Sequence, residues 1–193
     1  TDGSHYWYVA LDENHRPAKV MRHRLGTPQA EDVVVYEEAD PGFFVHIGKT
    51  QSGRHLTISA SDHETSEIHL LDRSTPDAAL TVVSAREHRL IYSVEDWADY
   101  LVILTNADGA EDFKIVTTPL AAPGRANWQD AVPYRAGVMI RHLHVLGNHM
   151  VRLELENALP RIVVRDLAGN EHTVSFPEEA YSLGLHSGHE FET

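Results

Sequence analysis

A pattern of four short strands returns about every 47 residues in this chain, and such a repeat restricts the folds that it can adopt. One strand of the pattern occurs as RHR (22–24), IHL (68–70), KIV (114–116) and IVV (162–164), with centres 46, 46 and 48 residues apart. The strand before it occurs as YVA (8–10), LTI (56–58), LVI (101–103) and MVR (150–152). Turn-forming segments such as DENHRP (12–17) and QSGRH (51–55) separate the strands.

Two further series complete the repeating unit. The unit opens with FFVHI (43–47), LIYSV (90–94), IRHLH (140–144) and YSLGL (181–185). It closes with DVVVYEE (32–38), LTVVSARE (80–87), a weak member around NWQDAVPY (127–134), and EHTVSF (171–176). These segments are rich in β-branched and aromatic residues that often alternate with polar ones, which indicates β-strands.

Four antiparallel strands in each unit of this length are typical of a β-propeller blade. A single blade has two faces to cover, and stacking of neighbouring blades covers both. A β-sandwich of many short strands is the alternative, but a sandwich gives no reason for strand lengths to repeat. The sequence therefore predicts an all-β fold that is a segment of a β-propeller.

The repeat divides residues 1–193 into three complete blades and two partial ones, with no domain linker between them. We expect a partial blade at 6–38, full blades at 43–87, 90–135 and 139–176, and a second partial blade at 181–187. The chain thus reads as a slice of a larger propeller. Because an incomplete blade exposes an unpaired strand edge, we also expect self-association through the terminal blades.

Charge and composition narrow the range of partners. The formal net charge is −13, whereas a general nucleic-acid surface is basic, so nucleic acid is not an expected partner. The longest apolar runs, such as YLVILT (100–105), are strand-sized, and no membrane span is expected. The chain has no cysteine, which suits a reducing compartment, and we expect a cytoplasmic location.

Several short motifs are similar to known phosphate- or metal-binding motifs, but none of them predicts a binding site. GFFVHIGKT (42–50) resembles a phosphate-binding loop, but it has five residues where that loop needs four, and it reads as a strand. His142 and His144 would share one face of a strand, and His186 and His189 flank a Ser-Gly pair. Histidine pairs can bind metals, but nothing selects a third ligand.

The carboxylates lead to the same conclusion. NADGAED (106–112) is similar to a calcium-binding loop but lacks the ligand spacing of one, so a hairpin turn is expected. The pairs Glu37–Glu38 and Glu178–Glu179 lie at strand ends, where solvent is expected to reach them. No G-x-S-x-G nucleophile elbow occurs. We therefore predict no catalytic residue, no metal site and no cofactor in this chain.

Several long segments resemble the propeller of the oligopeptidase B (protease II) family, which belongs to the prolyl oligopeptidase clan of serine peptidases. They are RHRLGTPQAEDVVVYEEAD (22–40), FFVHIGKTQSGRHLTISASDHETSEIHLLD (43–72), YLVILTNADGAEDFKIV (100–116), NWQDAVPYR (127–135) and EFET (190–193). The resemblance implies a seven-bladed propeller that caps an α/β-hydrolase domain. It also implies a parent enzyme that cleaves short peptides after Lys or Arg.

In that family the catalytic Ser, Asp and His belong to the hydrolase domain, so the resemblance places none of them in this chain. The propeller's implied role is to exclude folded proteins and to help enclose the peptide. The expected partners are therefore oligopeptide substrates and the hydrolase domain of the parent enzyme. The alternative is a stand-alone propeller that serves as a binding scaffold without peptidase activity.

Overall fold

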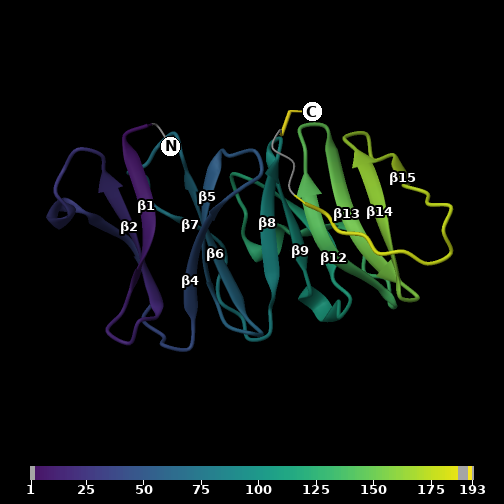
Figure 1. The fold of residues 1–193 in the computed structure, drawn as a ribbon, viewed down its shortest axis with the longest axis horizontal. Coiled ribbons are helices and arrows are strands. Elements are labelled where there is room, and N and C mark those ends of the chain that lie inside the picture. Colours follow the sequence, from purple (N-terminus) through teal and green to yellow (C-terminus); the bar gives the residue numbers. More distant parts are fainter. Residues whose placement is uncertain (1–2, 187–190, 193) are drawn as a thin grey trace. The chain divides into compact units, whose positions relative to one another are not determined.

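The structure, a computed structural model, describes residues 3–186 and 191–192. The chain forms two compact units, Thr1–Leu90 and Ile91–Thr193. Each unit contains two antiparallel sheets, and in every sheet the neighbouring strands are consecutive in the chain (Figure 1). The described residues contain no helix with the length and apolarity that crossing a bilayer requires.

The first unit, purple to blue in Figure 1, has sheets of strand order β1-β2-β3 and β4-β5-β6-β7. Its strands are β1 (His5–Leu11), β2 (Pro17–Arg24), β3 (Val33–Glu37), β4 (Phe44–Lys49), β5 (His55–Ser61), β6 (Ser66–Asp72) and β7 (Thr81–Ser84). A single turn of 3-10 helix, η1 (Gln29–Glu31), precedes β3.

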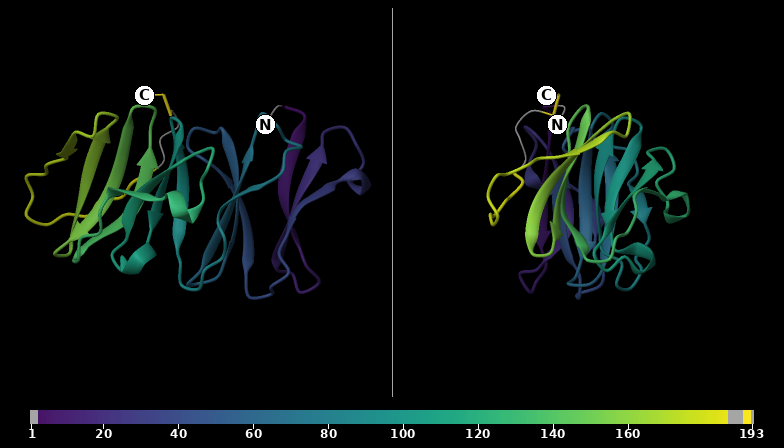
Figure 2. Two further views of the ribbon diagram at one scale, coloured as in Figure 1. Left: turned by 180° about the vertical axis from the view of Figure 1, so that it is seen from behind. Right: turned by 90° about the vertical axis from the view of Figure 1, so that its right-hand side faces the viewer.

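The second unit, teal to yellow, has sheets of order β8-β9-β10-β11 and β12-β13-β14-β15 (Figure 2). Its strands are β8 (Tyr92–Trp97), β9 (Tyr100–Thr105), β10 (Lys114–Pro119), β11 (Gln129–Val132), β12 (Val138–Val145), β13 (His149–Glu156), β14 (Leu159–Asp166) and β15 (Glu171–Thr173). Two 3-10 turns, η2 (Ala107–Gly109) and η3 (Arg125–Asn127), flank β10.

Within each unit the two sheets pack face to face through apolar side chains. In the first unit, Trp7 and Val20 of one sheet share a buried cluster with Val45, Ile58 and Leu71 of the other. Alternation along the strands produces this packing, since every second residue of a strand points to the same face. The expected face-to-face packing of neighbouring sheets is therefore found within this unit.

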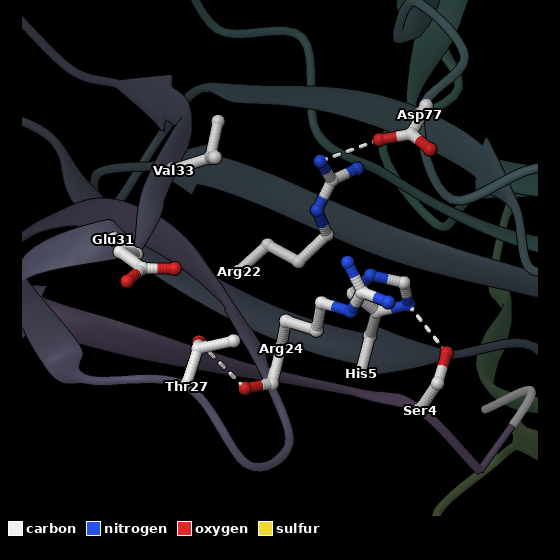
Figure 3. Close-up of a pocket in the computed structure, with 8 residues that line it drawn as sticks. All are labelled: Ser4, His5, Arg22, Arg24, Thr27, Glu31, Val33 and Asp77. Carbon is white, nitrogen blue, oxygen red and sulfur yellow. Dashed lines mark hydrogen bonds and ion pairs between the residues drawn. The ribbon is translucent and has the colours of Figure 1, made fainter.

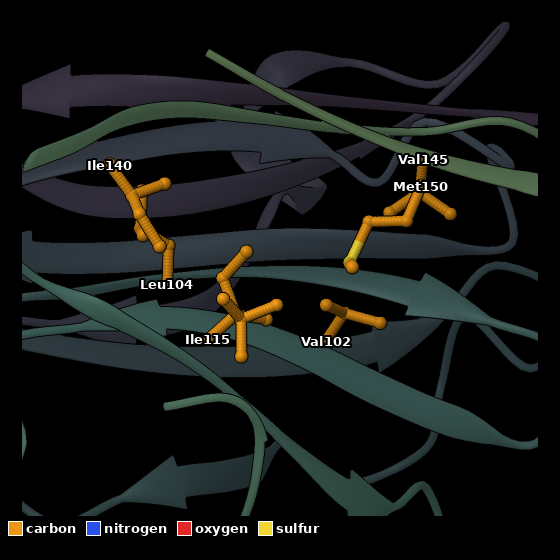
Figure 4. Close-up of a cluster of buried hydrophobic side chains, with 7 residues drawn as sticks. Val102, Leu104, Ile115, Ile140, Val145 and Met150 are labelled. Atoms are coloured by element: carbon orange, nitrogen blue, oxygen red, sulfur yellow. The ribbon is translucent and has the colours of Figure 1, made fainter. Parts of the chain in front are cut away.

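The core of the second unit is built in the same way (Figure 4). Val102 and Ile115 of one sheet pack with Ile140, Val145 and Met150 of the other. Strand β9 is buried on both faces, with every residue from Leu101 to Thr105 less than 9% exposed. Its sequence YLVILT has no alternation of polar residues, which is what a strand covered on both sides requires.

Four antiparallel sheets of three or four strands confirm the predicted all-β fold. The first sheet has three strands, β1, β2 and β3. The expected strand of a further blade at 181–187 is not formed over 181–186, and residue 187 lies outside the described residues. This expectation is corrected for a physical reason: a strand needs a backbone partner, and no described residue pairs with this segment, in which Gly184 also disfavours extended pairing.

Candidate functional site

The segment that resembles a phosphate-binding loop is a strand. Residues Phe44–Lys49 form β4, which pairs along its whole length with β5. A phosphate-binding loop needs free backbone N–H groups at the start of a helix. Most of residues 42–50 lie in an extended strand that is paired with β5, and no helix follows, so the segment does not have the form of such a site.

The paired histidines of β12 have a third histidine near them. His142 is exposed and His144 is half-buried, with a register irregularity just before His142. Burial lowers the pKa of His144, and the charges of His142 and His186 lower it further. Sequence spacing did not select His186 as a neighbour of this pair, and His189 lies outside the described residues. Among the residues that the structure describes, no three His, Cys, Asp or Glu side chains are grouped so that they could hold a metal ion.

The carboxylate-rich turn at 106–112 already has cationic partners. Asp108 accepts hydrogen bonds of 3.0 Å from Lys114 Nζ and 2.6 Å from an Arg125 guanidinium nitrogen. These two bonds hold the pKa of Asp108 below its usual range. Asp112 accepts a bond of 2.7 Å from the backbone N–H of Gly137. The turn therefore uses its carboxylates to fix neighbouring loops.

The two predicted carboxylate pairs differ in environment. Glu37 is exposed and forms a 2.8 Å ion pair with Lys19, and Glu178 and Glu179 are also exposed. Glu38 is different, because its side chain is only 6% exposed and lies 2.6 Å from Arg86. The expectation of solvated carboxylates is therefore wrong for Glu38, which the fold buries against Arg86 from the segment that follows β7.

Arg86 is the centre of a cluster in the first unit that sequence reasoning missed. Its guanidinium stacks 3.7 Å from the ring centroid of Phe43, and it also lies 3.6 Å from Glu67. Burial and the hydrogen bond to Glu38 raise the pKa of Tyr36, whose hydroxyl donates to that carboxylate at 2.9 Å. No local pattern signals such a cluster, since its members come from four separate segments.

A Tyr–Asp–His group lies on the first sheet. Tyr8 donates a 2.6 Å hydrogen bond to Asp32, and Nδ1 of His23 lies 2.6 Å from the other oxygen of that carboxylate. The bond from Tyr8 and then the contact with His23 lower the pKa of Asp32. In a catalytic triad the histidine lies between the acid and the nucleophile. Here the acid is central, so the group cannot pass a proton from a nucleophile to histidine.

The pockets in the described part of the chain include one in the first unit and two in the second. The first, called the arginine pocket, has a volume of about 430 Å³ and lies in the first unit (Figure 3). It is lined by Ser4, His5, Arg22, Arg24, Thr27, Glu31, Val33 and Asp77. Arg22 forms a 2.5 Å ion pair with Asp77, from the loop that follows β6. Two arginines thus face two carboxylates, and the pocket has little net charge.

The second, called the apolar pocket, has a volume of about 390 Å³ and lies between the two sheets of the second unit. Its main lining residues are Trp97, Tyr100, Val102, Ala131, Met150 and Leu167. Val102 and Met150 of its lining also belong to the buried core cluster (Figure 4), so the pocket borders that core. A mostly apolar cavity with a few polar groups is the usual form of a ligand site.

Comparison with known proteins finds one protein family that matches the whole chain. A family model described as the N-terminal β-propeller domain of prolyl oligopeptidase matches residues 1–193. Dipeptidyl aminopeptidase BI from Pseudoxanthomonas mexicana is 35% identical over 193 residues, which are 100% of this chain and 27% of that protein. Protease 2 from Moraxella lacunata is 32% identical over 192 residues, 99% of this chain and 27% of that protein.

A solved structure gives the same result in three dimensions. Oligopeptidase B from Trypanosoma brucei, in its closed form with covalently bound antipain, matches with a TM-score of 0.83 at 32% identity. The match covers 91% of this chain and 26% of that chain. The chain therefore spans about a quarter of the length of the relatives that it matches.

Proposed function

Since the chain belongs to the prolyl oligopeptidase family and forms part of that family's N-terminal β-propeller domain, we propose that it gates the access of short peptides to a serine peptidase site in the same protein. The observation that carries the proposal is the match of the propeller domain over residues 1–193, together with coverage of only 26–27% of the relatives. The catalytic residues then lie in an α/β-hydrolase domain elsewhere in the protein.

The packing of the sheets supports a gating role. Each unit is held by a continuous apolar core between two sheets, as around Ile58 in the first unit and Ile115 in the second. Close-packed interiors deform little. A rigid propeller over an active site would admit a flexible peptide and exclude a folded protein.

We propose further that the parent enzyme cleaves after Lys or Arg. The net charge of −13 supports this, because an acidic domain raises the local concentration of cationic substrates and their rate of association. The relatives have different names, a dipeptidyl aminopeptidase and a protease 2, so the specificity needs its own test.

The test uses the intact protein and chromogenic amides that end in Arg, Lys, Pro or Ala. We expect kcat/KM for the Arg and Lys amides to be at least tenfold higher than for the others, and a serine-directed reagent to abolish all turnover. Raising the salt concentration should lower kcat/KM for the basic amides, because salt screens electrostatic steering. Faster cleavage of the Pro or Ala amide would overturn the proposed specificity but leave the peptidase assignment in place.

The alternative, a stand-alone binding scaffold, makes a different prediction about the gene. The coding sequence after Thr193 should contain further strands and then a G-x-S-x-G elbow if the chain gates a peptidase. A stop codon directly after Thr193 would favour the scaffold.

We propose a cytoplasmic location, which the absence of cysteine supports, and fractionation of cells followed by immunodetection tests it.

A further inference from the structure

The arginine pocket of the first unit contains four charged side chains, and two of them neutralise each other. Arg22 forms a 2.5 Å ion pair with Asp77 and donates a hydrogen bond to the carbonyl oxygen of Pro76. Both partners belong to the loop between β6 and β7. These contacts tie Arg22 to the neighbouring sheet, so its charge is already compensated within the chain.

The other two charges of the pocket have no partner. Within the described part of the chain, no hydrogen bond or ion pair reaches the guanidinium of Arg24 or the carboxylate of Glu31 (Figure 3). Both residues are exposed to solvent, and they do not pair with each other. One pocket therefore holds an uncompensated cation and an uncompensated anion at separate positions.

The fold fixes the backbone that carries Arg24. This residue ends β2 and lies opposite His5 of β1 in the strand register. Its carbonyl oxygen accepts a 2.9 Å hydrogen bond from the hydroxyl of Thr27, which closes the turn after the strand. On the facing strand, the hydroxyl oxygen of Ser4 lies 2.9 Å from Nδ1 of His5. The cation thus extends from a well-bonded sheet edge.

The carboxylate of Glu31 is carried by a fixed turn as well. Glu31 lies in η1, and its backbone N–H donates a 3.0 Å hydrogen bond to the carbonyl oxygen of Pro28. The next residue, Asp32, is held by the 2.6 Å bond from Tyr8 and the 2.6 Å contact with His23. The two unpartnered charges therefore keep their places on opposite elements of one sheet.

This arrangement favours a ligand that carries both charges. A simple anion would pair with Arg24 and leave Glu31 uncompensated, and a simple cation would do the reverse. A peptide with free termini has an α-carboxylate, which a guanidinium can bind through two parallel hydrogen bonds. It also has an α-ammonium, mostly protonated at pH 7, which a carboxylate can accept. The pocket volume of about 430 Å³ lies within the roughly 300–1,000 Å³ of ligand sites, so a ligand larger than one amino acid has room.

We propose that the arginine pocket binds a free di- or tripeptide by its two termini, with the α-carboxylate at Arg24 and the α-ammonium at Glu31. The choice of a peptide over other zwitterions rests on the proposed function, which supplies short peptides. The site goes beyond that function, because it recognises uncapped termini and not a bond to be cleaved. Longer peptides should bind less well, since each added residue separates the termini by up to about 3.5 Å.

Calorimetric titration of the intact protein tests the proposal, after a serine-directed reagent has blocked the peptidase site. The probe is Ala-Ala with free termini. Acetyl-Ala-Ala lacks the ammonium and Ala-Ala-amide lacks the carboxylate, and we expect each to bind about fivefold more weakly than the probe. Free alanine and penta-alanine, whose charges are too close together or too far apart, should also bind more weakly.

Variants locate the binding site. Arg24→Gln should weaken binding of Ala-Ala about fivefold and leave that of Ala-Ala-amide unchanged, because the amide has no carboxylate for the guanidinium. Glu31→Gln should weaken binding of Ala-Ala and leave that of acetyl-Ala-Ala unchanged. The matched controls are Arg89→Gln and Glu13→Gln, which remove exposed charges outside the pocket lining and should change nothing. Melting temperatures verify folding, and if a pocket variant does not fold, the capped peptides decide the question with the unaltered protein.

Equal binding of Ala-Ala and its capped forms, or equal effects of the pocket and control variants, would overturn the proposal. So would inorganic phosphate that binds as tightly as Ala-Ala and depends on Arg24 alone, because that result indicates a simple anion site. Equal binding of free alanine would overturn the assignment of a peptide.

Cleavage of basic amides by the untreated protein is measured in parallel. Binding that requires both termini, without cleavage, would remove the proposed function and leave the binding site. Cleavage without such binding would remove the binding site and leave the proposed function.

Discussion

Glu154 is 0% exposed, and its carboxylate accepts a 2.7 Å hydrogen bond from Nε of Arg152, a side chain that is itself only 3% exposed. Arg161 and Arg135 also contact this carboxylate, and Arg152 extends the network by a bidentate pair with Glu171 at 2.8 Å for both bonds. Burial raises the pKa of Glu154, but the bonds and charges of its arginine partners outweigh that effect, so its pKa lies below the usual range.

Replacing Glu154 with Gln should destabilise the propeller by about 3 kcal/mol, because it removes one partner of a buried ion network and leaves the cations uncompensated. Glu156→Gln is the matched control, since Glu156 is 38% exposed and pairs with Arg161 alone. We expect the control to cost less than about 1 kcal/mol. Thermal or denaturant unfolding measures the free energy of unfolding of both variants. Equal losses in the two variants would contradict the prediction that the buried carboxylate of Glu154 contributes more to stability than the exposed one of Glu156.

The same carboxylate predicts how stability depends on pH. Because the folded state lowers the pKa of Glu154, the unfolded state binds its proton more readily. The resulting stabilisation is fully present above the ordinary carboxyl pKa and is lost as the pH falls through the lower folded pKa. Unfolding free energies measured from pH 7 down to pH 3 should therefore fall less steeply in Glu154→Gln than in the unaltered protein. Parallel curves would contradict this prediction.

Arg86 should not tolerate a conservative change. Arg86→Lys loses the planar stack on Phe43 and the forked contact with Glu38, since a lysine ammonium can reproduce neither. We expect a loss of about 1–2 kcal/mol in unfolding free energy. The control is Arg89→Lys, because Arg89 is 72% exposed and lies 3.5 Å from Glu64, so its replacement should cost less than about 0.5 kcal/mol. An unchanged melting temperature for Arg86→Lys would show that the stack on Phe43 and the forked contact with Glu38 do not stabilise the fold.

Strand β9 tests the close packing of the sheets. Ile103 is 0% exposed, and truncation to Ala should cost about 2–5 kcal/mol, the usual range for a buried aliphatic residue that leaves a cavity. Val82→Ala serves for comparison, because Val82 is 42% exposed, and it should change the free energy of unfolding by less than about 0.5 kcal/mol. If Ile103→Ala melts at the temperature of the unaltered protein, β9 is not packed on both faces.

The edge of the first sheet predicts how the isolated chain 1–193 behaves. Strand β1 pairs with β2 on one side, and no described strand pairs with its other side. An open edge offers backbone donors and acceptors to another chain. We expect light scattering over a concentration series to show growth of a dimer. A monomer mass at every concentration would rule out pairing between copies.

The repeat made most of the fold predictable, because each unit must place an apolar face where its neighbour can cover it. RHR (22–24) lies within β2 and KIV (114–116) lies within β10, as the spacing requires. The strand expected at 181–187 shows the limit of that reasoning. The position of YSLGL (181–185) in the repeat suggested a strand there, whereas a strand also requires a partner, and the described residues provide none.

The sites were less predictable than the strands. Arg152 and Glu154 are two residues apart on β13, so the period of a strand places them on one face. Nothing local indicates that Arg135 and Glu171, from other segments, complete their network. His186 likewise reaches the histidine pair of β12 through the course of the chain after β15. Contacts of this kind depend on tertiary structure and cannot be predicted from the spacing of residues along the sequence.

The most direct measurement compares the intact protein with the isolated chain 1–193, using one short peptide that contains Lys and the same peptide sequence held within a folded protein. We expect the intact protein to cleave the short peptide after Lys and to leave the folded protein uncut. We also expect the isolated chain to cleave neither, and a serine-directed reagent to abolish cleavage by the intact protein. Turnover by the purified chain 1–193 that survives repurification, or equal cleavage of the folded protein, would contradict the assignment of this chain as a non-catalytic gate.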